Sequence, residues 1–317
     1  MGYLEQEDII GHSASRAFLA RSIASKRHHA YLLVGAAHLG KDTVARALIA
    51  DELNRPVKDW SDLAAHPDVC VLSLEEGEKN ISVVAVRAFI NHFASSSMLG
   101  GRKIGVIRGA HDLSIGAANA LLKTLEEPSG KALIVLIADS LERLPETIKS
   151  RCQLIRFLSV PGAAIKAGLM ARGVTQAAAE SAAAFAAGRP GLAVLHAEDS
   201  SLREKHASRA RSFIELVSRP LASRLQSVGE ITAKAEMPEL EACLDAWLAA
   251  LRDLLSAKTG NERYAADPET LGLLRLYGER RSLAELITAL RKVLLGKRLL
   301  TENVNVRLIF ENIALTL

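Results

Sequence analysis

A nine-residue stretch, GAAHLGKDT from Gly35 to Thr43, constrains the fold of this 317-residue chain more than any other segment. It follows the apolar run YLLV and precedes the helical pattern VARALIADEL. A glycine-rich loop between a buried strand and a helix can hold phosphate, because backbone N–H groups point into it and the N-terminus of the helix is partly positive. The GxxxxGK spacing therefore predicts a phosphate-binding loop in a parallel α/β domain.

The loop has the glycines and the lysine of a nucleotide site but lacks the hydroxyl that binds magnesium. Gly35 and Gly40 allow the backbone to approach a ligand closely, and Lys41 can reach the outer phosphates. The next position should carry a hydroxyl that binds magnesium, but it is Asp42, and Thr43 comes one residue too late. A carboxylate beside a polyphosphate is unfavourable, because like charges repel strongly at low dielectric. We interpret the stretch as a degenerate phosphate loop; the alternative is a glycine-rich turn that never binds a nucleotide.

Hydrolysis of a nucleotide also needs acidic residues at the end of a neighbouring strand, which hold the metal ion and activate water. The strand expected to supply them, KIGVI, runs into Arg108 and the tripeptide GAH. Asp112 follows four residues after Arg108, and we expect it to cap the loop or helix that comes next. The sequence therefore predicts a site without a catalytic acid.

Short β-rich runs alternate with helical patterns between residues 31 and 158, which is typical of a parallel sheet whose strands are buried on both faces. After Ser159 the strand patterns stop, and an alanine-rich segment with helical spacing continues to about Glu198. Longer helical patterns follow, interrupted by the loop TGNERYAADPET. We predict three domains: an α/β domain at 1–158, a small helical domain at 159–199 and an all-α domain at 200–317.

Composition and charge limit the class of protein. A net charge of +4 and a pI near 9.0 permit contact with nucleic acid without requiring it. The cysteines at positions 70, 152 and 243 form no C-x-x-C pair, so neither a disulfide framework nor a zinc ribbon is predicted. The N-terminus MGYLEQEDII lacks the features of a signal peptide, and no apolar run approaches the length of a membrane span. We therefore expect a soluble cytoplasmic protein that makes no membrane contact.

Two longer motifs, NALLKTLEEP at 119–128 and LPETIKSRC at 144–152, resemble the clamp-loader branch of AAA+ proteins. IIGH near the start, HHAYLLVG before the loop and NVNVRLIFENIALTL at the end extend the resemblance over essentially the whole chain. It implies an AAA+ α/β domain, a small helical lid domain and an all-α collar domain that assembles with other subunits. Two members of the bacterial DNA polymerase III clamp loader compete, the delta-prime subunit and the ATPase subunit called gamma or tau.

Three departures from the ATPase subunit favour the delta-prime type. In the ATPase subunit the strand KIGVI would end in an Asp-Glu pair, which falls here on Arg108 and Gly109. A sensor arginine in a G-x-x-R pattern falls on Gly191, and Asp42 replaces the hydroxyl. This resemblance implies a stationary subunit that does not hydrolyse ATP by itself; the alternative is a gamma/tau-type motor subunit with an unusual loop. No cofactor is required, although Lys41 leaves ATP or ADP binding open.

The four-cysteine zinc module that many relatives carry after the first helix is not expected. The segment NRPVKDWSDLAAHPD stands in that region without a cysteine. Zinc is therefore not predicted for this chain.

The SRC triplet, Ser150 to Cys152, is where the resemblance implies a catalytic role in trans. Arg151 would project into the ATP site of a neighbouring gamma or tau subunit and offset the charge of the transferred phosphoryl group. The competing interpretation is a surface arginine that pairs with Glu142 or Glu146 and contributes only about 0 to 1 kcal/mol. Cys152 is expected to be a small buried apolar residue.

The resemblance also implies partners. These are the gamma/tau and delta subunits and, through the complex, the sliding clamp and primer–template DNA, so that the chain would help to load the clamp within the DNA polymerase III holoenzyme. Lys123, Glu126 and Glu127, at the end of NALLKTLEEP, are expected on a helix surface or in packing between subunits. The C-terminal helices could form a self-contained bundle or part of a collar. A stand-alone DNA-binding AAA+ protein is a third hypothesis, which the mild charge and 4% aromatic content do not support.

Overall fold

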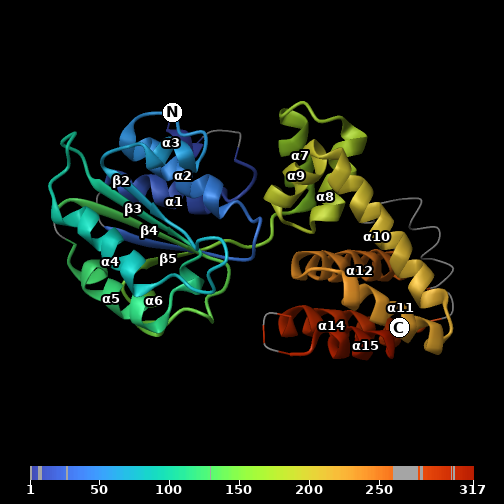
Figure 1. Ribbon diagram of the computed structural model, residues 1–317. Coiled ribbons are helices and arrows are strands. Elements are labelled where there is room, and N and C mark those ends of the chain that lie inside the picture. The colour runs from blue at the N-terminus through green and yellow to red at the C-terminus, as the bar shows by residue number, and fades with distance from the viewer. Residues whose placement is uncertain are drawn as a thin grey trace. The chain divides into compact units, whose positions relative to one another are not determined.

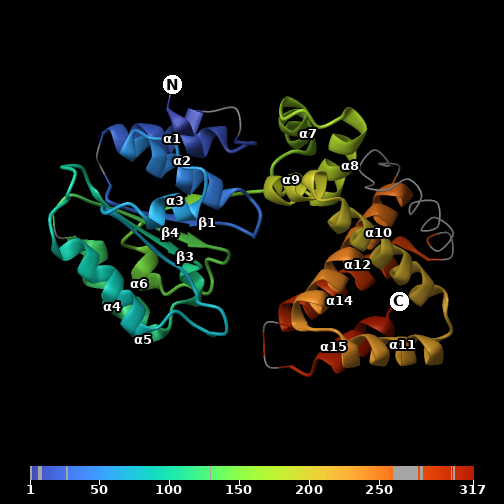
Figure 2. The same ribbon diagram turned by 45° about the horizontal axis from the view of Figure 1, so that its top comes forward.

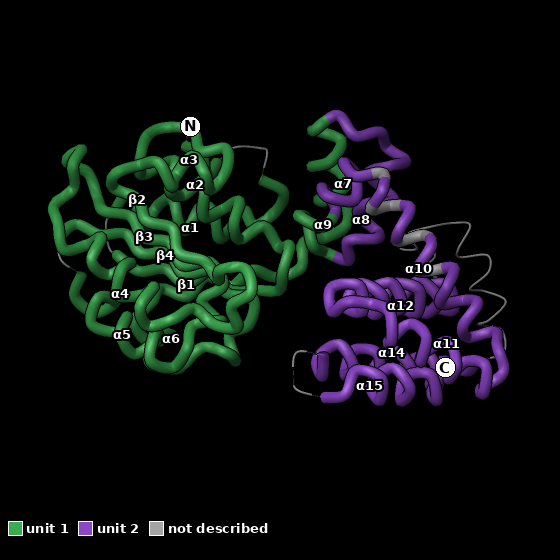
Figure 3. Tube along the Cα trace, in the orientation of Figure 1, with its two compact units in different colours: residues 1–172, 188–192 green, residues 173–187, 193–317 purple. Residues whose placement is uncertain are grey.

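A computed structural model describes residues 2–5, 9–25, 28–128, 130–259, 278, 281–300, 302 and 304–317 (Figure 1). The chain divides into two compact units (Figure 3). The α/β unit comprises residues 1–172 and 188–192, and the helical unit comprises 173–187 and 193–317. The boundaries of the three domains stay a prediction. The loop TGNERYAADPET lies, beyond its first residue, outside the described residues.

The α/β unit is built on a five-stranded sheet in the order β2-β3-β4-β1-β5, and all neighbouring strands are parallel. Its strands are β1 (Ala30–Val34), β2 (Val69–Leu72), β3 (Lys103–Arg108), β4 (Ala132–Ala138) and β5 (Gln153–Arg156). This confirms the prediction of a parallel α/β fold. Because parallel strands end at the same edge of a sheet, the segments that follow β1, β3 and β4 come together there.

Helices cover both faces of the sheet, as the two views in Figures 1 and 2 show. Side chains alternate along β1, so that Tyr31 and Leu33 join one hydrophobic cluster while Leu32 and Val34 join the other. The first cluster lies under α1 (Ser13–Ala24), α2 (Lys41–Leu53) and the short α3 (Trp60–Ala64); the second lies under α4 (Val83–Asn91), α5 (Ile115–Glu126) and α6 (Glu146–Lys149). Burial on both faces explains why the strands read as continuous apolar runs.

The described residues after β5 contain helices and no strand, which confirms the helical prediction for this half of the chain. None of the described helices is long and apolar enough to cross a membrane. The helices are α7 (Gly162–Ala171), α8 (Gln176–Ala186), α9 (Pro190–Glu198), α10 (Ser200–Ser218), α11 (Leu221–Lys234), α12 (Met237–Lys258), α14 (Leu283–Leu299) and α15 (Val306–Ala314).

The helical unit has an aromatic core of its own. Trp247 of α12 is 1% exposed, and its ring centroid lies 5.6 Å from that of Phe213 in α10 and 5.4 Å from that of Phe310 in α15. Aromatic rings at this separation contribute beyond the area that they bury. Three helices far apart in the sequence are thereby held at one point.

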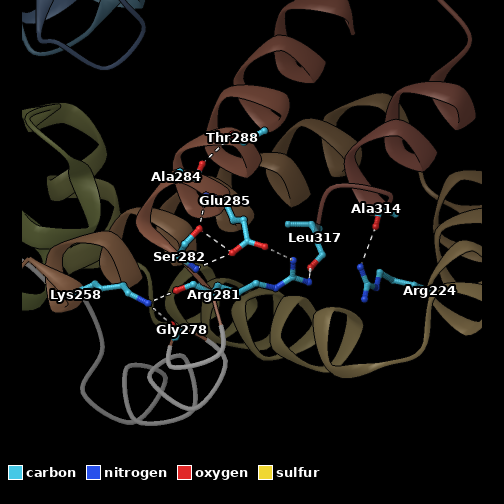
Figure 4. Close-up of polar contacts among 10 residues, drawn as sticks. All are labelled: Arg224, Lys258, Gly278, Arg281, Ser282, Ala284, Glu285, Thr288, Ala314 and Leu317. Atoms are coloured by element: carbon cyan, nitrogen blue, oxygen red, sulfur yellow. Dashed lines mark hydrogen bonds and ion pairs between the residues drawn. The ribbon is translucent and has the colours of Figure 1, made fainter.

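Polar contacts fix the beginning of α14 and the end of α15 (Figure 4). α14 begins with a capping box, in which Ser282 Oγ accepts the Glu285 amide at 3.2 Å and the Glu285 carboxylate accepts the Ser282 amide at 2.7 Å. At the end of α15, Arg224 donates to the Ala314 carbonyl at 3.0 Å and Arg281 donates to the Leu317 carbonyl. These arginines bind carbonyl groups that lack a partner within the helix.

Close packing behind β3 gives a first testable prediction. A Cβ added at Gly105 would lie 2.4 Å from Phe89 Cζ and 2.5 Å from Phe93 Cζ, and both rings are buried. We expect Gly105→Ala to lower the free energy of unfolding of the full chain by about 1–3 kcal/mol, because overpacking forces the rings to move. Urea denaturation measures this change.

Gly101→Ala is the matched control, since a Cβ at Gly101 meets nothing within 4 Å. We expect this variant to stay within about 0.5 kcal/mol of the wild type. Equal destabilisation by the two substitutions would contradict the packing argument.

Candidate functional site

The phosphate-type loop spans residues 35–40 between β1 and α2, at the edge where the parallel strands end. Gly35 donates its amide hydrogen to the Ala138 carbonyl at 3.2 Å, which ties the loop to the end of β4. Gly35 has a φ of 155°, and a Cβ there would lie 2.3 Å from the Phe157 carbonyl oxygen. The strand-to-helix loop thus requires glycine at this position for a steric reason.

Lys41 is the first residue of α2, and its side chain is only 3% exposed. Its Nζ donates to the carbonyls of Gly35 at 2.6 Å and Ala36 at 2.7 Å, and it lies 2.8 Å from Asp139 Oδ1. Asp139 directly follows β4. An ammonium group has three hydrogens to donate, so these three acceptors satisfy it within the chain.

Asp42, the residue in place of the metal-binding hydroxyl, pairs with Arg108 at the end of β3. Arg108 Nε donates to Asp42 Oδ1 at 2.9 Å. Trp60 Nε1 donates to the same oxygen at 3.2 Å, and the Arg108 guanidinium carbon lies 5.1 Å from the Trp60 ring centroid, within cation–π range. Asp42 and Arg108 therefore form one ion pair, although they lie 66 residues apart in the sequence. Both are positions that depart from the residues of a nucleotide site.

The charges around the loop cancel. Lys41 and Arg108 are balanced by Asp139 and Asp42. The nearby histidine His111 accepts the Asp139 amide hydrogen on Nδ1 at 3.2 Å, and burial lowers its pKa despite the neighbouring carboxylates. Arg108 would oppose a magnesium ion beside Asp42, and a phosphate would have to compete with the three acceptors that Lys41 already contacts.

His12 closes the loop from the other side. Its Nε2 donates to the Leu39 carbonyl at 2.8 Å, and its ring lies 4.6 Å from the Phe157 ring, centroid to centroid. Burial lowers the pKa of His12, with Arg16 acting in the same direction and the hydrogen bond to Leu39 opposing it. The imidazole is therefore neutral at pH 7 and adds no positive charge to the loop.

Gly191, where the resemblance implies a sensor arginine in the ATPase subunit, contacts the loop through its backbone. Its amide donates to the His38 carbonyl at 2.8 Å. A Cβ at Gly191 would lie 3.0 Å from that carbonyl oxygen, so a side chain would require the loop or α9 to shift slightly. Glycine at this position thus allows a direct backbone contact.

Gly40 and Thr43 are the two other residues of the stretch that the sequence singles out. Gly40 is the N-cap of α2 with a φ of 91°, which favours glycine. Thr43 lines a separate pocket of about 200 Å³ with Tyr3, Ile9 and Ala47, so its hydroxyl does not replace the missing one.

Asp112 was expected to cap the loop or helix that follows it, and it does not cap the helix. Ser114 is the N-cap of α5, and its Oγ accepts the Ala117 amide at 3.3 Å. Asp112 ends a short 3-10 helix, and its carboxylate accepts from Arg143 at 2.9 Å. The residue with extended backbone angles directly before the helix takes the capping role, and that residue is Ser114.

Arg151 lies in a second cluster, built from α5 and the end of α6. Its Nε donates to Glu126 Oε1 at 2.6 Å, and its Nη1 donates to the Thr147 carbonyl at 3.0 Å and to Ser150 Oγ at 3.3 Å. Neither of the carboxylates considered from the sequence pairs with it: Glu146 instead pairs with Lys149 at 3.2 Å. The partner is Glu126, 25 residues upstream.

Cys152, the last residue of the SRC triplet, is half-buried. Burial raises the pKa of its thiol to about 12, so the sulfur stays protonated at neutral pH. Cys152 packs against the hydrophobic cluster under α5 and α6, although it is less buried than expected from the sequence. Within the described residues, no group of three or more His, Cys, Asp or Glu side chains is placed to hold a metal ion.

Sequence reasoning missed three participants, namely Asp139, Trp60 and Glu126. A signal for Asp139 was available, because it is the first polar residue after the apolar run ALIVLIA and parallel strands end at one edge. Trp60 belongs to the cysteine-free segment after α2, and nothing in its spacing indicates that it contacts Asp42. The structure brings Gly35, Lys41 and Asp42 together with Arg108, while Arg151 belongs to the separate cluster around Glu126.

Comparison with known proteins gives consistent matches. Residues 11–161 match the family model described as DNA polymerase III, delta subunit. The DNA polymerase III subunit delta' of Pseudomonas aeruginosa is 37% identical over 209 residues, which are 62% of this chain and 63% of that protein. The subunit delta' of Escherichia coli is 33% identical over 184 residues, 54% and 55% of the two chains. The subunit gamma of Buchnera aphidicola is 34% identical over 155 residues, 46% and 43% of the two chains.

The aligned part spans less than two thirds of the length of each of these relatives. Residues 11–161, which the family model matches, include the phosphate-type loop, the NALLKTLEEP segment and the SRC triplet. The part of the chain that holds the parallel sheet and the loop between β1 and α2 is therefore similar in sequence to clamp-loader subunits of DNA polymerase III.

Proposed function

We propose that the chain is a non-hydrolysing subunit of the delta-prime type, which completes the ATPase site of a neighbouring subunit in the clamp loader. The observation that carries this proposal is the ion pair between Asp42 and Arg108. In a hydrolysing site these two positions supply metal ligands to the same magnesium ion. Here one of them is a cation that binds the other.

Electrostatics supports the absence of hydrolysis. A guanidinium 2.9 Å from the carboxylate already supplies the positive charge that a divalent ion would bring, and a second cation beside it would be repelled. The carboxylate that would activate water is not replaced by another residue at the end of β3, where the chain continues as Gly109 and Ala110. The loop therefore keeps its shape without the groups that cleave a phosphate bond.

The environment of Lys41 opposes nucleotide binding. Its three acceptors would have to be given up before the ammonium could reach a phosphate, and one of them is a full carboxylate. The contact between Gly191 and His38 closes the loop further from the side of α9. We infer that the site is empty of nucleotide during the working cycle and that no cofactor is required.

The role in trans rests on Arg151. Its side chain is 31% exposed at the surface of the α/β unit, and its guanidinium is held by side-chain and backbone acceptors. Arginine suits this function because its guanidinium keeps its charge and holds its N–H groups in one fixed plane. Gamma or tau subunits are the proposed neighbours, together with a delta subunit, and the sliding clamp and primed DNA are reached through the complex.

The helical unit has a surface suited to assembly. Leu283, Ile287 and Leu294 are between 36% and 49% exposed on α14, at spacings that place them on one side of the helix. Leu286, Ala289 and Val293 are buried on an adjoining side of the helix. This exposed apolar row supports the proposal that α14 packs against other subunits in a collar.

A motor subunit of the gamma or tau type is the second candidate, because subunit gamma relatives match at 34% identity. Such a subunit would need Asp42 to release Arg108 and to bind magnesium. It would also need a carboxylate elsewhere to activate water. The two candidates differ in whether the chain alone hydrolyses ATP.

The arginine role predicts the effect of Arg151→Ala on the ATPase rate of the reconstituted clamp loader. We expect the rate at the neighbouring site to fall by about tenfold or more, because an arginine that offsets phosphoryl charge is lost. Arg151→Lys should not restore it, since an ammonium lacks the fork geometry. Lys41→Ala in this chain should leave the rate unchanged.

The chain by itself should show no ATPase activity. Subunit assembly, measured by gel filtration, serves as the control for each variant. ATP hydrolysis by the isolated chain that is lost with Lys41→Ala would establish the motor function instead.

Exchange of the ion pair for metal ligands gives a prediction about the loop. We expect the double variant Asp42→Thr with Arg108→Asp to bind a fluorescent ADP analogue about tenfold or more tightly than the wild type, and only with magnesium present. A hydroxyl and a carboxylate then face the metal position, and the opposing guanidinium is gone. Fluorescence anisotropy with and without magnesium measures the difference.

Adding Lys41→Ala to this double variant should abolish the gain, because the lysine contacts the outer phosphates. Magnesium-dependent binding by the wild type, at the affinity of the double variant, would contradict the idea that the ion pair disables the loop.

A further inference from the structure

We propose that Glu126 is a positioning residue, which orients the Arg151 guanidinium toward the neighbouring subunit. The inference rests on the proposed role of Arg151 in trans and adds a residue that the resemblance did not assign. It starts from the observation that one oxygen of Glu126 binds one whole edge of the guanidinium. Oε1 accepts from Nε at 2.6 Å and also pairs with Nη2.

The opposite side of the guanidinium is fixed as well. Nη1 donates to the Thr147 carbonyl at 3.0 Å and to Ser150 Oγ at 3.3 Å. Both acceptors belong to α6 or its C-cap, whereas Glu126 is the last residue of α5. Two separate helices therefore determine the plane of the group.

Both supporting helices are anchored in the core of the α/β unit. Leu121 and Leu125 of α5 and Ile148 of α6 are 1% exposed or less and belong to the hydrophobic cluster on the same face of the sheet. A side chain bound from rigid elements on two sides loses little further freedom when its ligand arrives. The arrangement is thus preorganised before any neighbouring subunit binds.

The hydrogen-bonding pattern leaves a defined direction for the ligand. A guanidinium has five N–H groups, and Nε, Nη1 and the inner hydrogen of Nη2 face the acceptors of this chain. The outer hydrogen of Nη2 points away from Glu126. An oxygen of another subunit's nucleotide could approach this hydrogen.

The role of Glu126 differs from that of an ordinary surface ion pair. The Glu126 side chain is 47% exposed, so the pair by itself adds little to stability. Its effect lies in geometry, because a displacement of about 1 Å at a catalytic group can lower a rate by up to about a hundredfold. Loss of Glu126 should therefore change the neighbour's turnover and leave the folding of this chain nearly unchanged.

Glu127 provides a matched control in the same dipeptide. It has the same charge, lies one residue further along and is the C-cap of α5, with backbone angles that leave the helix. The Arg151 contacts that define the cluster involve Glu126, Thr147 and Ser150. Glu127→Gln thus removes one negative charge from the same region without removing an Arg151 contact.

The test measures kcat and KM for ATP of the reconstituted clamp loader with variants of this chain. We expect Glu126→Gln to lower kcat by about threefold, because one amide oxygen still accepts, and Glu126→Ala to lower it by about tenfold. KM for ATP should stay within about twofold of the wild type, and Glu127→Gln should match the wild type in both constants.

A double variant tests whether Glu126 acts through Arg151. In the Arg151→Ala background, Glu126→Ala should have no further effect on kcat, because two residues that act as one unit are not additive. In the chain alone, NMR exchange of the Arg151 Nε–H with water should speed up in Glu126→Ala and stay slow in Glu127→Gln. This readout needs no neighbouring subunit.

The outcomes separate the two proposals. An unchanged kcat with Arg151→Ala would overturn the function in trans itself. A large loss with Arg151→Ala, together with wild-type kcat for Glu126→Ala, would overturn only the positioning role. A higher kcat with Glu126→Ala would also overturn it, since Glu126 would then hold the arginine back. If the effects of Glu126→Ala and Arg151→Ala on kcat were additive in the double variant, Glu126 would act independently of Arg151, and the positioning role would again be overturned.

Discussion

A buried ammonium group must be surrounded by acceptors, and at Lys41 this requirement ties together three parts of the α/β unit. The lysine comes from the start of α2, two acceptors are carbonyls of the loop, and the third is a carboxylate that follows β4. The loop keeps the form of a phosphate cradle because its own lysine fills it. The neighbouring pair between Asp42 and Arg108 brings the local charge to zero, so that neither a metal ion nor a polyphosphate is needed for balance.

Much of the fold could be predicted from the sequence, and the reason is physical. Strands buried on both faces must be apolar at every position, so runs such as ALIVLIA mark them directly. The pairing of Asp42 with Arg108 could not be predicted in the same way. It depends on strand order, since β1 and β3 lie on either side of β4, and single-strand patterns carry no information about order. The N-cap of α5 is Ser114 and not Asp112, and since both residue types suit a cap, only the backbone angles distinguish them.

The surroundings of Arg151 illustrate a second limit of sequence reasoning. Sequence spacing favours Glu142 and Glu146 as its partners, because both lie close to Arg151 in the chain. The contact is instead made across two helices that pack on the same face of the sheet, so that the end of α5 reaches the end of α6. The motif residues Glu126 and Arg151, which seemed to be separate signatures, form one structural unit. Tertiary packing, and not local spacing, decides which charged groups meet.

The hydrogen bond from Gly191 to the His38 carbonyl has a thermodynamic consequence for communication within the chain. A ligand can shift an equilibrium only through contacts that differ between the two states. A sensor side chain that touches a nucleotide forms its contact when the nucleotide is bound and loses it on release, so it reports occupancy to the next helix. The backbone contact between Gly191 and His38 is formed without any ligand. The beginning of α9 is therefore tied to the loop by a bond that does not depend on a nucleotide for one of its partners.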